Sequence, residues 1–159
     1  LWAKRIKFIY DNEGKYDAMA SLDKLNEGWY KKEGQYIMQQ SNVYAANSVP
    51  VKFRSIGLDP AVRTSMTSDE VNVLAETEHN RWNVEQLLMH YSLVSKSEFE
   101  EFERGCRVRK NELKQRMRHI DICSYSRLDD LDPGVEIYDI SLIRSLPYIV
   151  GRYNERKSK

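Results

Sequence analysis

Apolar residues recur every three to four positions along most of the chain, which is the period of an α-helix. In residues 1–11, Ile6, Ile9 and Tyr10 stand among lysines and arginines, and this pattern predicts an amphipathic helix. Residues 16–27 are polar and irregular, so we expect a linker or a strap there. The chain has only seven glycines and four prolines, which favours long helices over tight turns.

Two long helices are predicted next. The first covers about residues 33–56, with Gly57 placed to end it and Pro50 inside it, where we expect a kink or a split. The second opens at Thr67-Ser68-Asp69-Glu70, a capping-box pattern with acidic residues in the first turn, and runs to about Tyr91.

Shorter elements are predicted in the C-terminal half. Ser97 is placed to cap a helix that is interrupted near Gly105 and ends near Met117. An irregular stretch and a turn at Asp132-Pro133-Gly134 precede a last helix, expected over residues 135–150. Together these elements predict a mainly α fold: a small helical domain with an N-terminal helical arm and at most a short β-hairpin.

Composition narrows the class of protein. Hydrophobic residues make up 41% of the chain, enough for one core and too many for a disordered segment. No run of 18 apolar residues is present, so we expect no membrane span. We also expect no signal peptide at the start of the sequence. The sequence begins at Leu1 without a Met, from which we expect a missing N-terminal partner segment.

The cysteines and the charge exclude further classes. Cys106 and Cys123 are too few for a disulfide framework and lack zinc-ligand spacing, so we expect two reduced thiols in a cytoplasmic protein. A net charge of +1 argues against binding nucleic acid or an anionic membrane through bulk charge. The basic run from Arg104 to Arg118 follows an acidic stretch, and we interpret it as a solvated helix face rather than a phosphate site.

The densest group of polar and aromatic residues lies in the second long helix. It comprises Glu78, His79, Arg81, Trp82, Asn83 and Glu85. These residue types suit a purine, because the indole ring stacks, a carboxylate accepts from an exocyclic amine and Arg81 meets a phosphate. The structural alternative is that Trp82 anchors a core and the charged residues form its solvated rim.

Three further residues are candidates for the same site. Asn42 and Tyr44 lie in the first long helix, where a short amide either bonds locally or reaches across a gap. Asp139 stands near the start of the last predicted helix, as a helix-terminus charge or as a ligand acceptor. We predict that Asn42, His79, Trp82 and Asp139 converge on one cleft.

Motifs of the common enzyme classes are absent from the sequence. Glu78-His79 lacks the second histidine of HExxH, and there is no G-x-S-x-G, no P-loop and no G-x-G-x-x-G. We therefore predict a protein that is not an enzyme, with no catalytic residues, no cofactor and no metal.

Several segments resemble the ryanodine-receptor repeat, or RyR domain, of bacterial type. The stretch L-A-E-T-E-H-N-R-W-N-V-E-Q-L-L (residues 74–88) resembles the opening helix of that domain. The residues that match its second half are His119, Ile120, Ile122, Tyr125, Leu128, Tyr138-Asp139, Ile143, Leu146, Pro147 and Ile149. Upstream matches resemble the join that follows a TrkA-like NAD-binding domain, and they are Ala3, Ile6, Tyr10, Trp29, Ser41-Asn42, Ala45-Ala46, Lys52 and Gly57.

The resemblance implies an arm over residues 1–65 and an RyR domain over residues 66–153. It also implies a non-enzymatic regulatory module that binds an adenine-nucleotide-like ligand and is attached to an NAD-binding domain or a channel. Met89-His90-Tyr91-Ser92 replaces the G-W-x-Y-G of the family and Ile120 replaces a proline, so the ligand cannot be copied from the family. The alternative function is protein interaction or homo-oligomerisation.

Overall fold

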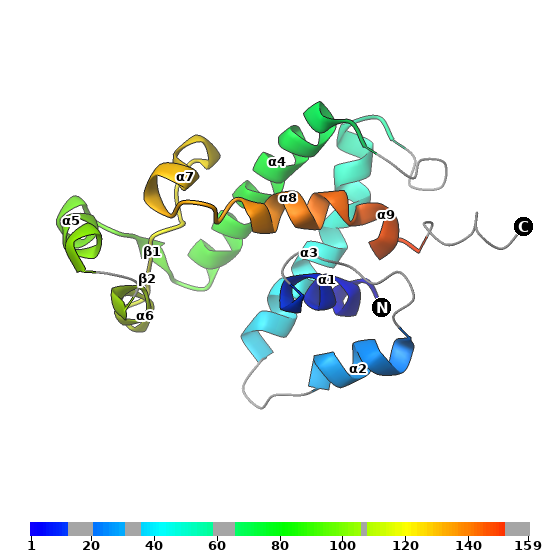
Figure 1. Cartoon of the computed structure of the whole chain (residues 1–159), viewed down its shortest axis with the longest axis horizontal. Coiled ribbons are helices and arrows are strands. Elements are labelled where there is room, and N and C mark those ends of the chain that lie inside the picture. Colours follow the sequence, from blue (N-terminus) through cyan, green and yellow to red (C-terminus); the bar gives the residue numbers. More distant parts are fainter. Residues whose placement is uncertain (13–20, 31–35, 59–65, 106–107, 152–159) are drawn as a thin grey trace, which may run out of the picture. The chain divides into compact units, whose positions relative to one another are not determined.

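The fold is mainly α, as predicted (Figure 1). The computed structural model describes residues 1–12, 21–30, 36–58, 66–105 and 108–151, with side chains except at 101–111. Of the described residues 73% are helical, in nine α-helices. These are α1 (Trp2–Asp11), α2 (Leu22–Tyr30), α3 (Tyr36–Ser55), α4 (Ser68–Leu88), α5 (Lys96–Gly105), α6 (Val108–Gln115), α7 (Leu128–Leu131), α8 (Ile137–Arg144) and α9 (Leu146–Ile149).

The β structure of the described residues stays within the predicted limit of a short hairpin, but its two short strands are parallel. Strand β1 (Ser92–Leu93) pairs with β2 (Arg118–His119), with Ser92 opposite Arg118. Parallel strands need a crossover connection rather than a tight turn, and α5 and α6 supply it. The Arg118 Nη1 donates to Ser92 Oγ at 2.7 Å and strengthens this short pairing.

The chain divides into two compact units. The first unit comprises Leu1–Glu78 with Ile137–Lys159, and the second comprises His79–Glu136. The boundary falls inside α4, between Glu78 and His79. This division into compact units does not test whether residues 66–153 form an RyR domain, which stays a prediction.

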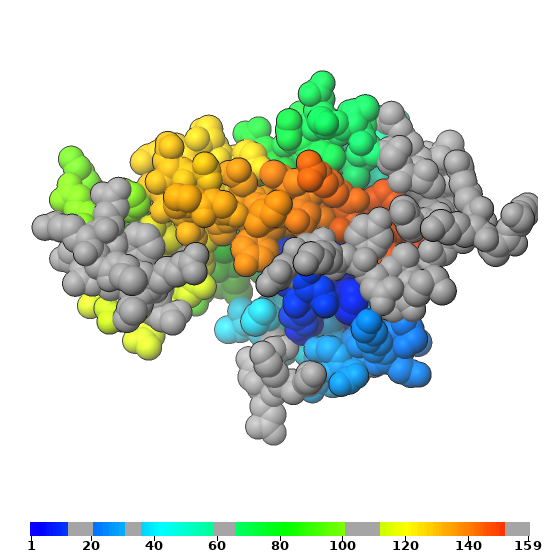
Figure 2. All heavy atoms as spheres, in the orientation of Figure 1, coloured from blue at the N-terminus to red at the C-terminus, as the bar shows by residue number. Residues whose placement is uncertain are grey.

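In the first unit, α1 is the central helix. It packs against α2, α3, α8 and α9, and its surface lies beside that of α8 in Figure 2. Ile6 and Ile9 on α1 are fully buried, and so is Ile143 on α8. The amphipathic helix predicted over residues 1–11 is therefore confirmed, and its apolar face supplies part of the core.

Arg5 on α1 binds the C-terminal end of α9. Its Nη1 donates to the carbonyl oxygens of Tyr148 at 3.0 Å and Ile149 at 2.7 Å, which are helix-end acceptors without a helical donor. Gly151 follows with a φ of +83°, and a Cβ there would lie 3.1 Å from Arg5 Nη1. The left-handed backbone therefore favours glycine at this position, and a Cβ there would also displace the Arg5 guanidinium slightly.

The linker predicted over residues 16–27 is wrong from Leu22 onward, where α2 begins. Ser21 Oγ accepts a hydrogen bond from the backbone N–H of Lys24 at 3.2 Å, which is N-cap geometry. Leu25 is buried and gives the helix its packing contact. Ser21 was the missed signal.

Helix α3 ends as predicted but is not split by Pro50. Proline lacks a backbone N–H, so only one helical hydrogen bond is lost there. At the end of the helix, Gly57 has a φ of +68°. Its backbone N–H donates to the carbonyl oxygen of Arg54 at 3.0 Å, and the N–H of Leu58 donates to the carbonyl oxygen of Phe53 at 2.9 Å. These two bonds form a Schellman motif and confirm the glycine stop.

The start of α4 confirms the capping box. The backbone N–H of Thr67 donates to Glu70 Oε2 at 2.7 Å, and that of Glu70 donates to Thr67 Oγ1 at 3.3 Å. The cap of α5 was assigned to the wrong residue, because Ser95 rather than Ser97 exchanges the equivalent bonds with Glu98.

The predicted last helix is in two pieces. Helix α8 ends at Arg144 and α9 begins at Leu146, with Pro147 in its first turn. Proline is well suited to the first turn of a helix, where its missing N–H costs no bond. Within the described ranges, no helix combines the length and the apolar composition that crossing a bilayer requires.

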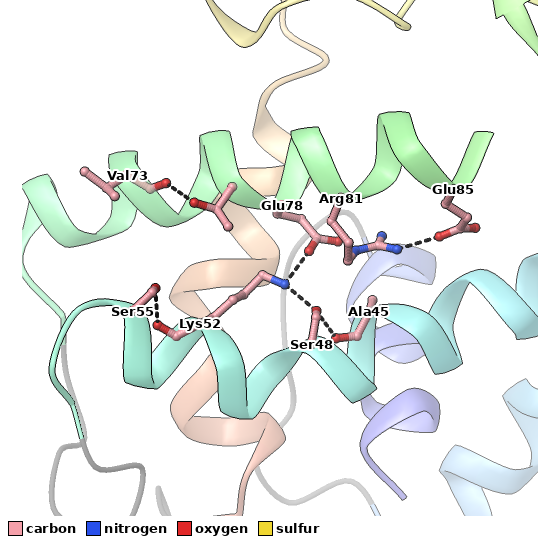
Figure 3. Close-up of polar contacts among 9 residues, drawn as sticks. Ala45, Ser48, Lys52, Ser55, Val73, Glu78, Arg81 and Glu85 are labelled. Carbon is pink, nitrogen blue, oxygen red and sulfur yellow. Dashed lines mark hydrogen bonds and ion pairs between the residues drawn. The ribbon is translucent and has the colours of Figure 1, made fainter. Parts of the chain in front are cut away.

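A buried ion pair joins α3 and α4 inside the first unit (Figure 3). Lys52 Nζ lies 2.7 Å from Glu78 Oε2, and the two side chains are 3% and 1% exposed. Lys52 also donates to Ser48 Oγ, one turn earlier on α3. The ammonium group is thus held by a carboxylate and a hydroxyl, which is what a buried charge requires.

We predict that Glu78→Gln destabilises the protein by about 3–5 kcal/mol, because the Lys52 charge is left buried without its counter-charge. The measurement is urea unfolding. Glu100→Gln is the control: its pair with Lys96 is on the surface at 4.0 Å and should contribute about 0–1 kcal/mol. The double variant Lys52→Met with Glu78→Leu should recover most of the loss. Equal stability of the two Glu→Gln variants would contradict the prediction.

Candidate functional site

The face that α4 buries is unusually polar. In the second unit His79, Glu85 and Gln86 are buried on it, while Leu87 and Leu88 are exposed. Burying such side chains is costly unless they are hydrogen-bonded, so the partners of each decide what this face does.

The backbone carbonyl of Cys123 accepts two hydrogen bonds from α4. Asn83 Nδ2 lies 2.7 Å from it and His79 Nε2 lies 3.0 Å from it. A carbonyl oxygen only accepts, so the hydrogen of His79 is on Nε2, and the Asn83 amide must present its nitrogen. These bonds tie the segment after β2 to the middle of α4.

Trp82 lies within a group of aromatic rings in the second unit. It is stacked with His79 at 5.9 Å between ring centroids, and it meets His119 edge-on at 4.9 Å. Tyr125 is 5.7 Å from His79, and Tyr91 is 6.0 Å from His119. Offset and edge-on contacts of this kind are favourable for aromatic pairs. Trp82 is nevertheless partly exposed, so it is not sealed in a core.

Glu85 has one satisfied and one unsatisfied oxygen. Arg81 Nη1 donates to Glu85 Oε2 at 2.5 Å, as Figure 3 shows. Oε1 is buried and has no hydrogen-bond partner within the described part of the chain, although Glu85 is only 5% exposed. Asn83 Oδ1 is likewise buried without a hydrogen-bond partner among the described residues. The bond of the Asn83 amide to the Cys123 carbonyl uses its nitrogen, Nδ2. Each such atom costs about 1–3 kcal/mol unless something donates to it.

His119 is held by the turn that follows it. Its Nδ1 accepts a hydrogen bond from the backbone N–H of Asp121 at 3.3 Å, and Asp121 Oδ2 is 3.7 Å away. An imidazole that accepts at Nδ1 carries its hydrogen on Nε2. The imidazole ring of His119 is therefore held in one orientation next to Trp82.

The four candidate residues of the first unit have different surroundings. Asn42 is buried, and its Nδ2 donates to the carbonyl of Met38 at 2.8 Å, which is the local bonding of the structural alternative. Tyr44 is exposed, and Asp139 is in the first turn of α8, where a negative charge is favourable. Glu78 is bound to Lys52.

The structure brings His79 and Trp82 together in the second unit. Asn42 and Asp139 belong to the first unit, so the convergence of all four on one cleft is not tested and stays a prediction.

Several residues that contact the candidate site residues were not predicted from the sequence to belong to the site. His119 and Tyr125 stood among the residues that resemble the RyR domain, but they were not assigned to the site. The Cys123 carbonyl had no signal, because every residue has a backbone carbonyl. Among the residues that the structure describes, no three His, Cys, Asp or Glu side chains are grouped to hold a metal ion.

Comparison with protein-family models, with curated proteins and with solved structures finds no match for the chain. The RyR resemblance therefore stays a prediction, and the function rests on the residues themselves.

The Cys123 thiol is partly buried and free, as predicted, whereas Cys106 lies outside the described residues. Burial raises the pKa of Cys123 to about 11, and the negative charge of Asp121 adds to this effect. The thiol is therefore neutral near pH 7 and is a poor nucleophile there.

We predict that iodoacetamide alkylates Cys123 slowly at pH 8 and that the rate increases toward pH 11. The rate is measured by mass spectrometry on a Cys106→Ser protein.

The same shift in pKa affects stability. The unfolded thiol ionises at lower pH than the folded one, so unfolding releases a proton between the two pKa values. Stability should therefore fall as the pH rises from about 9 to about 11. A Cys123→Ser control should lose this part of the fall. Rapid alkylation of the folded protein at pH 8 would contradict the assignment.

Proposed function

We propose that the chain is a non-enzymatic regulatory module of a cytoplasmic protein, and that it binds a flat, purine-like ligand beside Trp82 in the second unit. One observation carries the proposal: Glu85 Oε1 is buried without a partner in the described chain, three residues from a partly exposed indole. Residues three apart on a helix are neighbours on its surface.

The chemistry of the two side chains is complementary to a nucleobase. Stacking of a base on an aromatic side chain contributes about 1–3 kcal/mol. A ring-edge N–H that donates to Glu85 Oε1 removes the cost of the unpaired oxygen. A ligand that does both therefore gains from the two features that a purely structural role leaves unexplained.

The role of Arg81 differs from the one expected from the sequence. Its guanidinium is bound to Glu85, so contact with a phosphate would compete with that ion pair. The proposal therefore assigns recognition to the base. The RyR resemblance supports a nucleotide-like ligand and an N-terminal NAD-binding domain as the partner that receives the signal.

A second candidate function is self-association or protein binding through α3. Ile37, Tyr44 and Val51 are exposed and lie seven residues apart, which places them along one side of the helix. Residues 36–51 also contain no charged side chain. Sedimentation of the wild-type protein and of Tyr44→Glu tests this function: a dimer that the substitution dissociates supports it, and a monomer at all concentrations contradicts it.

For the ligand, we predict that a purine nucleoside monophosphate raises the thermal midpoint, with a stabilisation of about 2.7 kcal/mol at 100 times its Kd. Ribose 5-phosphate, which lacks the base, should have no effect. Trp82→Phe should retain the fold and weaken binding several-fold, because the smaller ring stacks less. Trp29→Phe, on α2, is the matched control and should bind as wild type. If neither AMP nor GMP shifts the midpoint, the ligand-binding function is wrong.

A further inference from the structure

We infer that the site recognises a guanine-type base, through the hydrogen-bond donors on its ring edge, in preference to adenine. This inference rests on the proposed function and specifies the ligand class. It starts from which polar atoms of the second unit are already used and which are not.

Three side-chain donors of α4 are used within the fold. His79 Nε2 and Asn83 Nδ2 both donate to the Cys123 carbonyl, at 3.0 and 2.7 Å. Arg81 Nη1 donates to Glu85 Oε2. The buried atoms left without a partner on this part of α4 are both oxygens, Asn83 Oδ1 and Glu85 Oε1. The ligand is therefore expected to donate to the protein.

Helix geometry favours Glu85 as the residue that recognises the edge of the base. Residues two apart lie on different sides of a helix, so Asn83 and Glu85 do not share one ligand edge. Trp82 and Glu85 are three apart and are neighbours. A base stacked on the indole would therefore lie next to Glu85, whose carboxylate Arg81 holds through Oε2.

The two purines differ on that edge. An ionised carboxylate only accepts hydrogen bonds. Guanine presents adjacent donors there, the N1–H and the 2-amino group, and both suit carboxylate oxygens. Adenine presents its 6-amino donor next to N1, which is an acceptor, so one of its two positions opposes a carboxylate lone pair. A site built for donors rejects the analogue that lacks one.

The test is calorimetric titration of the wild-type protein with GMP, IMP and AMP, which carry the same ribose phosphate. We expect GMP to bind about tenfold or more tightly than AMP. IMP, which keeps N1–H but lacks the 2-amino group, should lie between them. Because these ligands are compared on one protein, the ranking does not depend on the folding of a variant.

The Glu85→Gln variant then tests directly whether Glu85 recognises the base. A glutamine amide both donates and accepts, so the preference for GMP over AMP should shrink to about threefold or less. Glu76→Gln is the matched control, because Glu76 is exposed on the same helix, and it should keep the wild-type ranking.

The outcomes separate the two proposals. AMP binding as tightly as GMP overturns the guanine inference and leaves the ligand-binding function intact. An unchanged GMP preference in Glu85→Gln also overturns the inference, since another group would then read the base. Absence of binding by all three nucleotides overturns both.

Discussion

The buried contact between Lys52 and Glu78 is the constraint on which the arrangement of α3 and α4 depends. An ion pair with side chains 3% and 1% exposed tolerates little displacement, because separating the charges without water is costly. It fixes the N-terminal part of α4 against α3 within the first unit. The pair therefore joins the two helices through one buried charge contact inside the first unit.

Helix α4 buries Val71, Leu74 and Ala75 in its N-terminal half and a series of paired polar groups from Glu78 onward. Glu78 is paired with Lys52, Glu85 with Arg81, and His79 and Asn83 share one backbone carbonyl. Networks of this kind hold one geometry well when every member is satisfied. The unsatisfied oxygens of Asn83 and Glu85 are therefore informative, because Glu78, His79 and Arg81 on the same helix are paired.

The sequence predicted the parts of the fold that depend on local chemistry. The capping box at Thr67 and Glu70, the Gly57 stop and the α1 helix were predicted because each needs only neighbouring residues. The parallel strand pair was not, since two-residue strands leave no alternation to detect and their pairing depends on a distant crossover. For the site, the residue types of α4 predicted which part of the chain carries the densest group of polar and aromatic side chains. The role of Glu78 depended on Lys52, and that of Asn83 on a backbone carbonyl, which residue types do not predict.

A purely structural interpretation and a ligand-binding one make different demands on Glu85. If α4 served only to join elements, a glutamine or a small apolar residue would pack there without a charge to satisfy, since Arg81 is not fully buried and can reach water. Retaining a carboxylate with one oxygen idle costs stability. Stability given up at a specific buried atom beside a partly exposed aromatic ring is typical of functional sites. The acceptor on Glu85 therefore favours a ligand with donors over a role in packing.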